Sequence, residues 1–337
     1  MVDNNPWNKA ANPFPNQPAF PVQANHQPEP PARKFNHHFI QEHAVDENNQ
    51  DTLQNKYPKP KEFPVNLLHT PKVMCPDKPY VLFLVVCLPT EVLGRAAIRR
   101  SWGTMAGVEG SAEMALSWRS VFAMGRADDE DEYITKESEN YGDILQGDFE
   151  DLAYEVTRKV MMGMAWAKDQ PPGCQPTYIF KTNLKVYINL PVLVPWIQSL
   201  KKTSEAYVGK LLREDRPTRE WDNPLFVSRN DYRGNIFPDI ARGPLYMISM
   251  DVVRDMVTAF HSVTPIAMED AYVGLLANYL GIRVTNDDHF ILIKKPSNFC
   301  HYRHMMFIFD IQPTEVMHVY KIVEEKHRYD ECADREL

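Results

Sequence analysis

The chain has 337 residues, of which 44% are hydrophobic and 24% are charged, ordinary values for a soluble globular protein. Such a length can bury a full-sized core in one large domain or two. The formal net charge of −8 argues against a nucleic-acid-binding protein, because no basic excess offsets repulsion by phosphates.

The cysteines make a structural zinc site unexpected, because they are widely spaced and form no CxxC pair. They are Cys75, Cys87, Cys174, Cys300 and Cys332. An oxidising compartment would allow one or two disulfides, and the spacing leaves their pairing open.

The N-terminal segment, residues 1–72, contains twelve of the 27 prolines and no glycine. Without helical or strand periodicity, it cannot bury enough apolar surface to offset the entropy of ordering, so we expect a disordered, stem-like segment. We expect one folded domain over residues 73–330 and a short tail over residues 331–337. The sequence shows no signal peptide, and its longest apolar run, residues 80–88, is too short to span a bilayer.

The pattern after residue 79 predicts alternating strands and helices. Residues 80–88 are continuously apolar, as in a strand that is covered on both faces. The expected elements that follow are a helix at 91–102, a strand at 118–124, helices at 128–141 and 153–168, and a strand at 177–180. This order predicts an α/β fold with a doubly wound, mostly parallel sheet flanked by helices.

A polar break over residues 181–185 ends the last of these strands, and apolar residues resume at 186–188. In an open α/β sheet, ligand-handling residues collect at the carboxyl ends of the strands. Lys181, Asn183 and Lys185 in this break are therefore candidate ligand-binding residues.

Several sequence blocks occur in an order that is similar to a known family. They are residues 95–103 (RAAIRRSWG), 141–149 (YGDILQGDF), 181–189 (KTNLKVYIN), 237–238 (FP), 243–249 (GPLYMIS) and 269–274 (EDAYVG). On these blocks, the region from about residue 79 to 325 resembles the β1,3-galactosyltransferases and β1,3-N-acetylglucosaminyltransferases of glycosyltransferase family 31.

This resemblance implies a GT-A-like fold and a hexosyltransferase. The reaction would move galactose or N-acetylglucosamine from a UDP-sugar to a glycan acceptor with inversion, in protein or lipid glycosylation. Family members are usually type II Golgi membrane proteins that use manganese. Their membrane anchor is not visible in this sequence. We expect the protein to contact a membrane only through such an anchor.

The resemblance also assigns candidate roles. Glu269 and Asp270 are the catalytic candidates, and in the family the second acidic residue of this pair is the proposed base that deprotonates the acceptor hydroxyl. Because Asp270 begins a helix-like stretch, helix capping is the competing role. Arg95, Arg99 and Trp102 stand in a motif that borders the nucleotide site, where guanidinium groups suit a diphosphate. The alternative is a structural helix whose tryptophan covers the core.

The chain departs from the family pattern where the family binds its metal. The two metal-binding aspartates are replaced by Asn183 and Lys185, and a metal-binding histidine near the C-terminus is replaced by Phe309. Amides and ammonium groups are poor ligands for hard cations, so we expect no metal site. Pro244 and Leu245 also fill a loop that the family keeps rich in glycine.

Two hypotheses of different class follow. The first is an active hexosyltransferase in which Lys185, or the arginines near Trp102, supply positive charge in place of the metal. The second is a catalytically silent relative that uses the fold to bind a sugar, a nucleotide or a protein.

Overall fold

The computed structural model describes residues 63, 65–75, 79–104, 116–127, 130–152, 154–200, 203–291 and 299–324. The predicted stem, apart from its last residues, and the predicted tail at 331–337 lie outside the described residues. All of the described residues belong to one compact unit, Lys34–Leu337.

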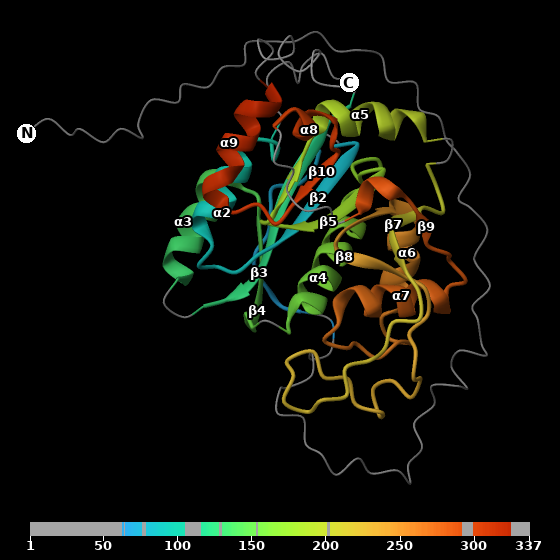
Figure 1. The fold of residues 1–337 in the computed structure, drawn as a ribbon. Coiled ribbons are helices and arrows are strands. Elements are labelled where there is room, and N and C mark those ends of the chain that lie inside the picture. Colours follow the sequence, from blue (N-terminus) through green and yellow to red (C-terminus); the bar gives the residue numbers. More distant parts are fainter. Residues whose placement is uncertain are drawn as a thin grey trace, which may run out of the picture. The chain divides into compact units, whose positions relative to one another are not determined.

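The described residues form ten strands, and Figure 1 shows their arrangement. They are β1 (Leu67–His69), β2 (Val81–Val86), β3 (Trp118–Arg126), β4 (Ile144–Glu150), β5 (Tyr178–Asn183), β6 (Val186–Ile188), β7 (Tyr207–Leu212), β8 (Ile240–Ser249), β9 (Thr285–Asn286) and β10 (Phe307–Phe309).

The helices in the same part of the chain separate most of these strands. They are α2 (Val92–Arg99), α3 (Asp131–Tyr141), α4 (Val156–Lys168), α5 (Leu190–Ser199), α6 (Met250–Ala259), α7 (Glu269–Tyr279), the short 3-10 helix η3 (Asp288–Phe290), α8 (Phe299–His304) and α9 (Pro313–Glu324).

Eight of the described strands form one sheet in the order β1-β4-β3-β2-β5-β8-β7-β9. Strands β4, β3, β2 and β5 run parallel, whereas β8 is antiparallel to both β5 and β7. Strands β10 and β6 form a separate antiparallel pair. The sheet is therefore mixed and mostly parallel, which confirms the predicted α/β class.

Helices cover both faces of this sheet (Figure 1). One core contains buried residues of α4, α6 and α7, and the other contains buried residues of α2, α3, α5 and α9. Every side chain of β2 is buried, since alternate residues of this central strand enter the two cores. Helix α4 approaches β2 closely at Gly163, where an added Cβ would lie 2.4 Å from the side chain of Leu84.

The predicted elements are present, with shifted ends. The strand predicted to end at residue 180 continues to Asn183, so Lys181 and Thr182 belong to β5 and not to a break after it. The reason is that β5 pairs on both sides: Lys181 lies opposite Leu84 of β2 and Tyr246 of β8. Tertiary pairing therefore overrides the polar character of these residues.

The folded domain begins earlier than the predicted boundary at residue 73. Strand β1 forms the edge of the sheet and pairs with β4, and the backbone N–H of Lys72 donates to the carbonyl of Gly142 over 2.9 Å. Gly142 has a φ of +63° and ends α3, a backbone conformation that suits glycine. Residues 67–72 are thus part of the sheet's edge.

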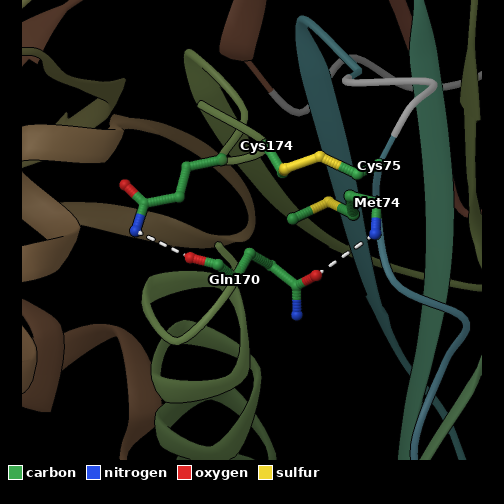
Figure 2. The surroundings of a disulfide bond; sticks show 5 residues. Met74, Cys75, Gln170 and Cys174 are labelled. Atoms are coloured by element: carbon green, nitrogen blue, oxygen red, sulfur yellow. Dashed lines mark hydrogen bonds between the residues drawn. A yellow bond between two sulfur atoms is a disulfide. The ribbon is translucent and has the colours of Figure 1, made fainter. Parts of the chain in front are cut away.

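A disulfide between Cys75 and Cys174 ties this N-terminal strand segment to the loop after α4 (Figure 2). Next to it, the backbone N–H of Met74 donates to the side-chain oxygen of Gln170 over 3.2 Å. The structure thereby decides one pairing that the sequence left open. Among the described cysteines, Cys87 is free and buried.

No helix in the described part of the chain is both long and apolar enough to cross a membrane.

The N-terminal boundary can be tested by shortening the chain. We expect a chain that begins at Phe63 to unfold in urea at the same midpoint as the full chain. A chain that begins at Pro79 should lose at least about 2 kcal/mol of unfolding free energy, because it lacks β1 and a disulfide that closes a long loop. The double variant Cys75→Ala/Cys174→Ala in the full chain measures the share of the disulfide. Equal stability of the two shortened chains would contradict the assignment of residues 65–75 to the fold.

Candidate functional site

The candidate site lies at the carboxyl end of β5, beside β8 and the first turn of α7. Because side chains alternate along a strand, Lys181 and Asn183 point to the same face of the sheet as Ile179, which packs in the core formed with α4, α6 and α7. Glu269 and Asp270 are the first two residues of α7. The structure therefore brings together Lys181 and Glu269, which are 88 positions apart in the chain.

Glu269 is fully engaged inside the protein. One carboxylate oxygen accepts a hydrogen bond from the ammonium group of Lys181, and the other accepts from the hydroxyl of Tyr246. Glu269 is 7% exposed and Lys181 is 5% exposed. Burial raises the pKa of Glu269 above its ordinary value, while the charge of Lys181 acts in the opposite direction. Burial and the nearby carboxylate also raise the pKa of Tyr246 well above that of free tyrosine.

Asp270 differs from its neighbour because it is only half-buried. The backbone N–H of Gly243 donates to Asp270 Oδ2 over 3.0 Å, and the N–H of Ala271 donates to Oδ1 over 2.9 Å. The second contact satisfies one of the first-turn donors of α7, whose N-cap position itself is Met268 and has no side-chain cap. The two N–H groups orient a carboxylate that still reaches solvent.

Gly243 lies at the centre of this cluster. A Cβ built on it would be 3.6 Å from Asp270 Oδ2 and 3.8 Å from Lys181 Nζ, which are ordinary contact distances. The following residue, Pro244, lies within β8, and Leu245 is buried in the core on the opposite face of the sheet. Pro244 and Leu245 therefore lie within β8, at the point where its pairing with β7 shifts in register.

Arg95 and Arg99 donate to protein groups. Arg95 is 0% exposed and donates to Glu137 and to the carbonyls of Leu88 and Pro89. Arg99 forms a bidentate pair with Asp143, with both distances at 2.8 Å, and also reaches Glu137. Although burial acts to raise the pKa of Glu137, the two arginines lower it below its ordinary value.

Trp102 lies in the core beneath α2. It is 1% exposed and packs edge to face against Phe83, with ring centroids 5.4 Å apart. Its carbonyl accepts a hydrogen bond from the indole N–H of Trp118 over 3.0 Å. These contacts match the structural interpretation of the first motif.

The positions expected to replace the family's metal ligands lie around the connection between β5 and β6, where Asn183 ends β5 and Lys185 lies in the turn. The side-chain oxygen of Asn183 accepts a hydrogen bond from the backbone N–H of Lys185 over 2.9 Å, and the side chain of Lys185 is exposed. Phe309 of β10 pairs with Val186, directly after this turn, and is 4% exposed. An amide that already accepts, an ammonium group and a phenyl ring do not fit a divalent cation.

A second buried ion pair braces the same edge of the sheet and was not singled out from the sequence. Lys159 of α4 contacts Asp151 over 2.6 Å and the carbonyl of Cys87 over 3.1 Å. Asp151 also accepts from the backbone N–H of Gly125 over 2.8 Å. The pair ties the ends of β2, β3 and β4 to the start of α4. The eight-residue spacing along the chain gives no signal of this contact.

Fold and site together define an α/β enzyme with an oriented, solvent-reaching carboxylate at the carboxyl edge of a mostly parallel sheet. The family model of the galactosyltransferases matches residues 94–288. The chain belongs to the galactosyltransferase family, whose members are glycosyltransferases that act on a sugar donor and an acceptor.

Individual relatives carry β1,3-transferase names. Beta-1,3-galactosyltransferase 5 of Mus musculus is 33% identical over 219 residues, covering 64% of this chain and 69% of that protein. Lactosylceramide 1,3-N-acetyl-beta-D-glucosaminyltransferase of Homo sapiens is 28% identical over 249 residues, covering 71% and 64%. UDP-GalNAc:beta-1,3-N-acetylgalactosaminyltransferase 1 of Homo sapiens is 29% identical over 213 residues, covering 62% of each. The chain is thus a member of a β1,3-hexosyltransferase family.

A solved structure with a looser likeness is a mannosyltransferase from Pyrobaculum calidifontis. It has 10% sequence identity and a TM-score of 0.35, and the match covers 72% of this chain and 64% of that one.

The ion pair between Lys181 and Glu269 can be tested through stability. We expect Lys181→Met to lower the unfolding free energy by about 3–5 kcal/mol, because it leaves a buried carboxylate without its cation. Urea unfolding measures the loss, and Lys181→Met/Glu269→Gln should recover part of it. Lys136→Met is the control, since that lysine forms an exposed pair with Glu132 that solvent screens, and it should leave the urea midpoint almost unchanged. A loss for Lys181→Met as small as that of the control would refute the role of the pair.

Proposed function

We propose that this protein transfers a hexose, galactose or N-acetylglucosamine, from a UDP-sugar to a hydroxyl of a glycan acceptor with inversion, and that Asp270 is the catalytic base. The family assignment supplies the type of donor and acceptor. The residues at the carboxyl edge of the sheet supply the choice of base.

The observation that supports this choice is the contrast between Glu269 and Asp270. Both oxygens of Glu269 accept hydrogen bonds from Lys181 and Tyr246, and the residue is buried. Asp270 is half-buried and is held by two backbone N–H groups, which leaves its carboxylate able to meet a substrate hydroxyl. A general base must come within hydrogen-bond reach of the proton that it takes. The greater exposure of Asp270 supports it over Glu269 as the proposed base.

In the proposed step, the acceptor oxygen attacks the anomeric carbon from the side opposite UDP. The bond from that carbon to the diphosphate oxygen breaks, and Asp270 takes the proton of the acceptor hydroxyl. Gly243 and Ala271 hold the carboxylate in place during the transfer. Lys181 and Glu269 fix the start of α7, on which Asp270 is carried.

Charge on the departing UDP requires positive groups nearby, and we assign this role to Lys185. Its ammonium group is exposed in the turn that follows β5, at a position where the family has an acidic residue. A fixed positive group can stabilise a leaving phosphate. Lys181 and Asn183 lie on β5, directly before this turn, and complete the proposed donor side of the site. We assign Arg95, Arg99 and Trp102 to the stability of α2 instead, because their contacts are with the protein.

The location of the protein follows from the same family. We propose the Golgi lumen or membrane, where a β1,3-hexosyltransferase would find its UDP-sugar and its glycoconjugate acceptors. The disulfide between Cys75 and Cys174 is consistent with an oxidising compartment.

A second function is favoured by one observation, the replacement of the metal ligands by Asn183 and Lys185. A silent relative that binds a sugar, a nucleotide or a protein would also keep the fold and lose the metal. Activity measurements on the variants below distinguish it from the active enzyme.

Asp270→Asn tests the proposed base. We expect it to lower the transfer rate by about 10²- to 10⁴-fold, because the amide cannot take the proton. UDP-release assays with UDP-galactose or UDP-N-acetylglucosamine and a mixture of neutral glycan acceptors measure the rate. Asp169→Asn, which changes a 74% exposed carboxylate at the end of α4, is the matched control and should leave the rate unchanged. Full activity of Asp270→Asn would remove Asp270 from the mechanism.

Lys185→Ala tests the replacement of the metal. We expect a loss of transfer of at least about tenfold, which corresponds to roughly 1.4 kcal/mol of barrier, and no gain on addition of manganese. The double variant Asn183→Asp/Lys185→Asp restores the acidic pair. If only this variant transfers sugar, and only with manganese, the natural chain is a lapsed enzyme. If the natural chain transfers sugar without manganese and Lys185→Ala does not, the lysine is an adaptation.

A further inference from the structure

The loop between β7 and β8, residues 213–239, carries three large apolar side chains in contact with solvent. Trp221 is 51% exposed, Leu225 is 40% exposed and Ile236 is 45% exposed. An exposed large apolar side chain on a loop beside a candidate site is a candidate ligand contact. The exposure of these three side chains is not explained by core packing or by contact with the candidate catalytic residues.

The backbone of the loop that carries these side chains is braced by hydrogen bonds within the loop. Arg219 donates to three carbonyls of the loop, those of Val227 at 2.6 Å and of Tyr232 and Gly234 at 2.8 Å. The hydroxyl of Tyr232 donates to the carbonyl of Ile236 over 2.6 Å. A rigid display lowers the entropy that a ligand must overcome on binding.

The same loop borders the candidate site. Thr218 Oγ1 lies 4.0 Å from the sulfur of Met268, the residue directly before Glu269. The end of the loop leads into β8, whose Gly243 holds Asp270. Figure 1 shows the loop in yellow beneath the orange helix α7. A ligand on this loop would therefore lie near the carboxylate that faces solvent.

The charge of the loop indicates which ligands suit it. Residues 213–239 contain five arginines and six acidic residues, and two of these arginines, Arg213 and Arg229, have partners in the loop at Asp239 and Asn235. With a net charge of −1, the loop has no excess of positive charge to attract an acidic ligand. The surface suits a neutral molecule that has apolar and polar faces.

We propose that Trp221 is a stacking platform for a pyranose ring of a neutral acceptor glycan. The proposal rests on the proposed function and adds the acceptor side of the same site. A pyranose has an apolar C–H face that matches the flat indole, and hydroxyls at its rim that the polar groups around the tryptophan can bind. Three exposed side chains make a surface smaller than a stable protein–protein interface, which favours a sugar over a protein partner.

Two measurements on the full chain test this platform. Saturation-transfer NMR compares binding of methyl β-galactoside, methyl β-N-acetylglucosaminide and methyl β-glucuronide to the wild type, Trp221→Ala and Trp221→Phe. Steady-state kinetics with an acceptor that is turned over compare acceptor KM and donor KM. The matched control is Tyr133→Ala, which removes a 66% exposed aromatic side chain from α3, on the opposite face of the sheet from α7.

We expect Trp221→Ala to weaken binding of a neutral glycoside, and to raise acceptor KM, by about five- to tenfold, and Trp221→Phe to retain most of the affinity. Donor KM should stay the same, and Tyr133→Ala should change neither quantity. Binding of neutral glycosides that is equal in the wild type and Trp221→Ala, no binding of either neutral glycoside, or preference for the glucuronide would overturn the inference.

The two proposals can fail separately. Tryptophan-dependent binding of a neutral glycoside in a protein that releases no UDP would overturn the proposed function and support the platform. Transfer that depends on Asp270 and is insensitive to Trp221 would overturn the platform alone. Binding of a protein that competes with neither glycoside, together with an unchanged acceptor KM in Trp221→Ala, would show that the loop is a protein interface and overturn the platform.

Discussion

The buried ion pair between Lys181 and Glu269 is the interaction on which the candidate site depends. It joins the central strand β5 to the first residue of α7, and Tyr246 adds β8 to the same contact. A buried charge without a partner is strongly unfavourable, so the pair fixes strand and helix relative to each other. Asp270 follows Glu269 in the chain and is oriented as a consequence. Lys181, Glu269 and Tyr246 are therefore both polar residues of the candidate site and the contacts that fix β5, β8 and α7 relative to one another.

Other charged residues of the protein also stabilise the fold through buried ion pairs. Arg99 is held by Asp143 and Glu137 and lies over the rings of Phe122 and Tyr141, at 4.7 and 4.0 Å from their centroids. The N–H groups of Arg99 that would suit a diphosphate donate to these carboxylates instead. A phosphate-binding motif and a buried brace use the same residue type, and their partners distinguish them.

Lys185, in the turn after β5, and Phe309, in β10, are far apart in the sequence and close together in the fold. Strand β10 pairs with β6, and the backbone N–H of Ile311 donates to the carbonyl of Lys185 over 3.0 Å. Phe309 and Lys185 are thus near neighbours, although more than a hundred residues separate them. By the resemblance of the sequence, both stand at positions where we expect family members to bind metal. The fold thus brings the two expected substitutions to one place.

The sequence by itself determined the fold class, because continuous apolar runs alternating with amphipathic stretches have few other solutions. It also determined the family and proposed the Glu269–Asp270 pair, since both depend on local residue order. Only the tertiary structure decided that Glu269 is buried against Lys181 while Asp270 is half-buried. It also decided that Arg95 pairs with Glu137 and that residues 67–69 join the sheet as β1. These outcomes depend on partners far away in the chain, and periodicity and motif spacing contain no information about such contacts.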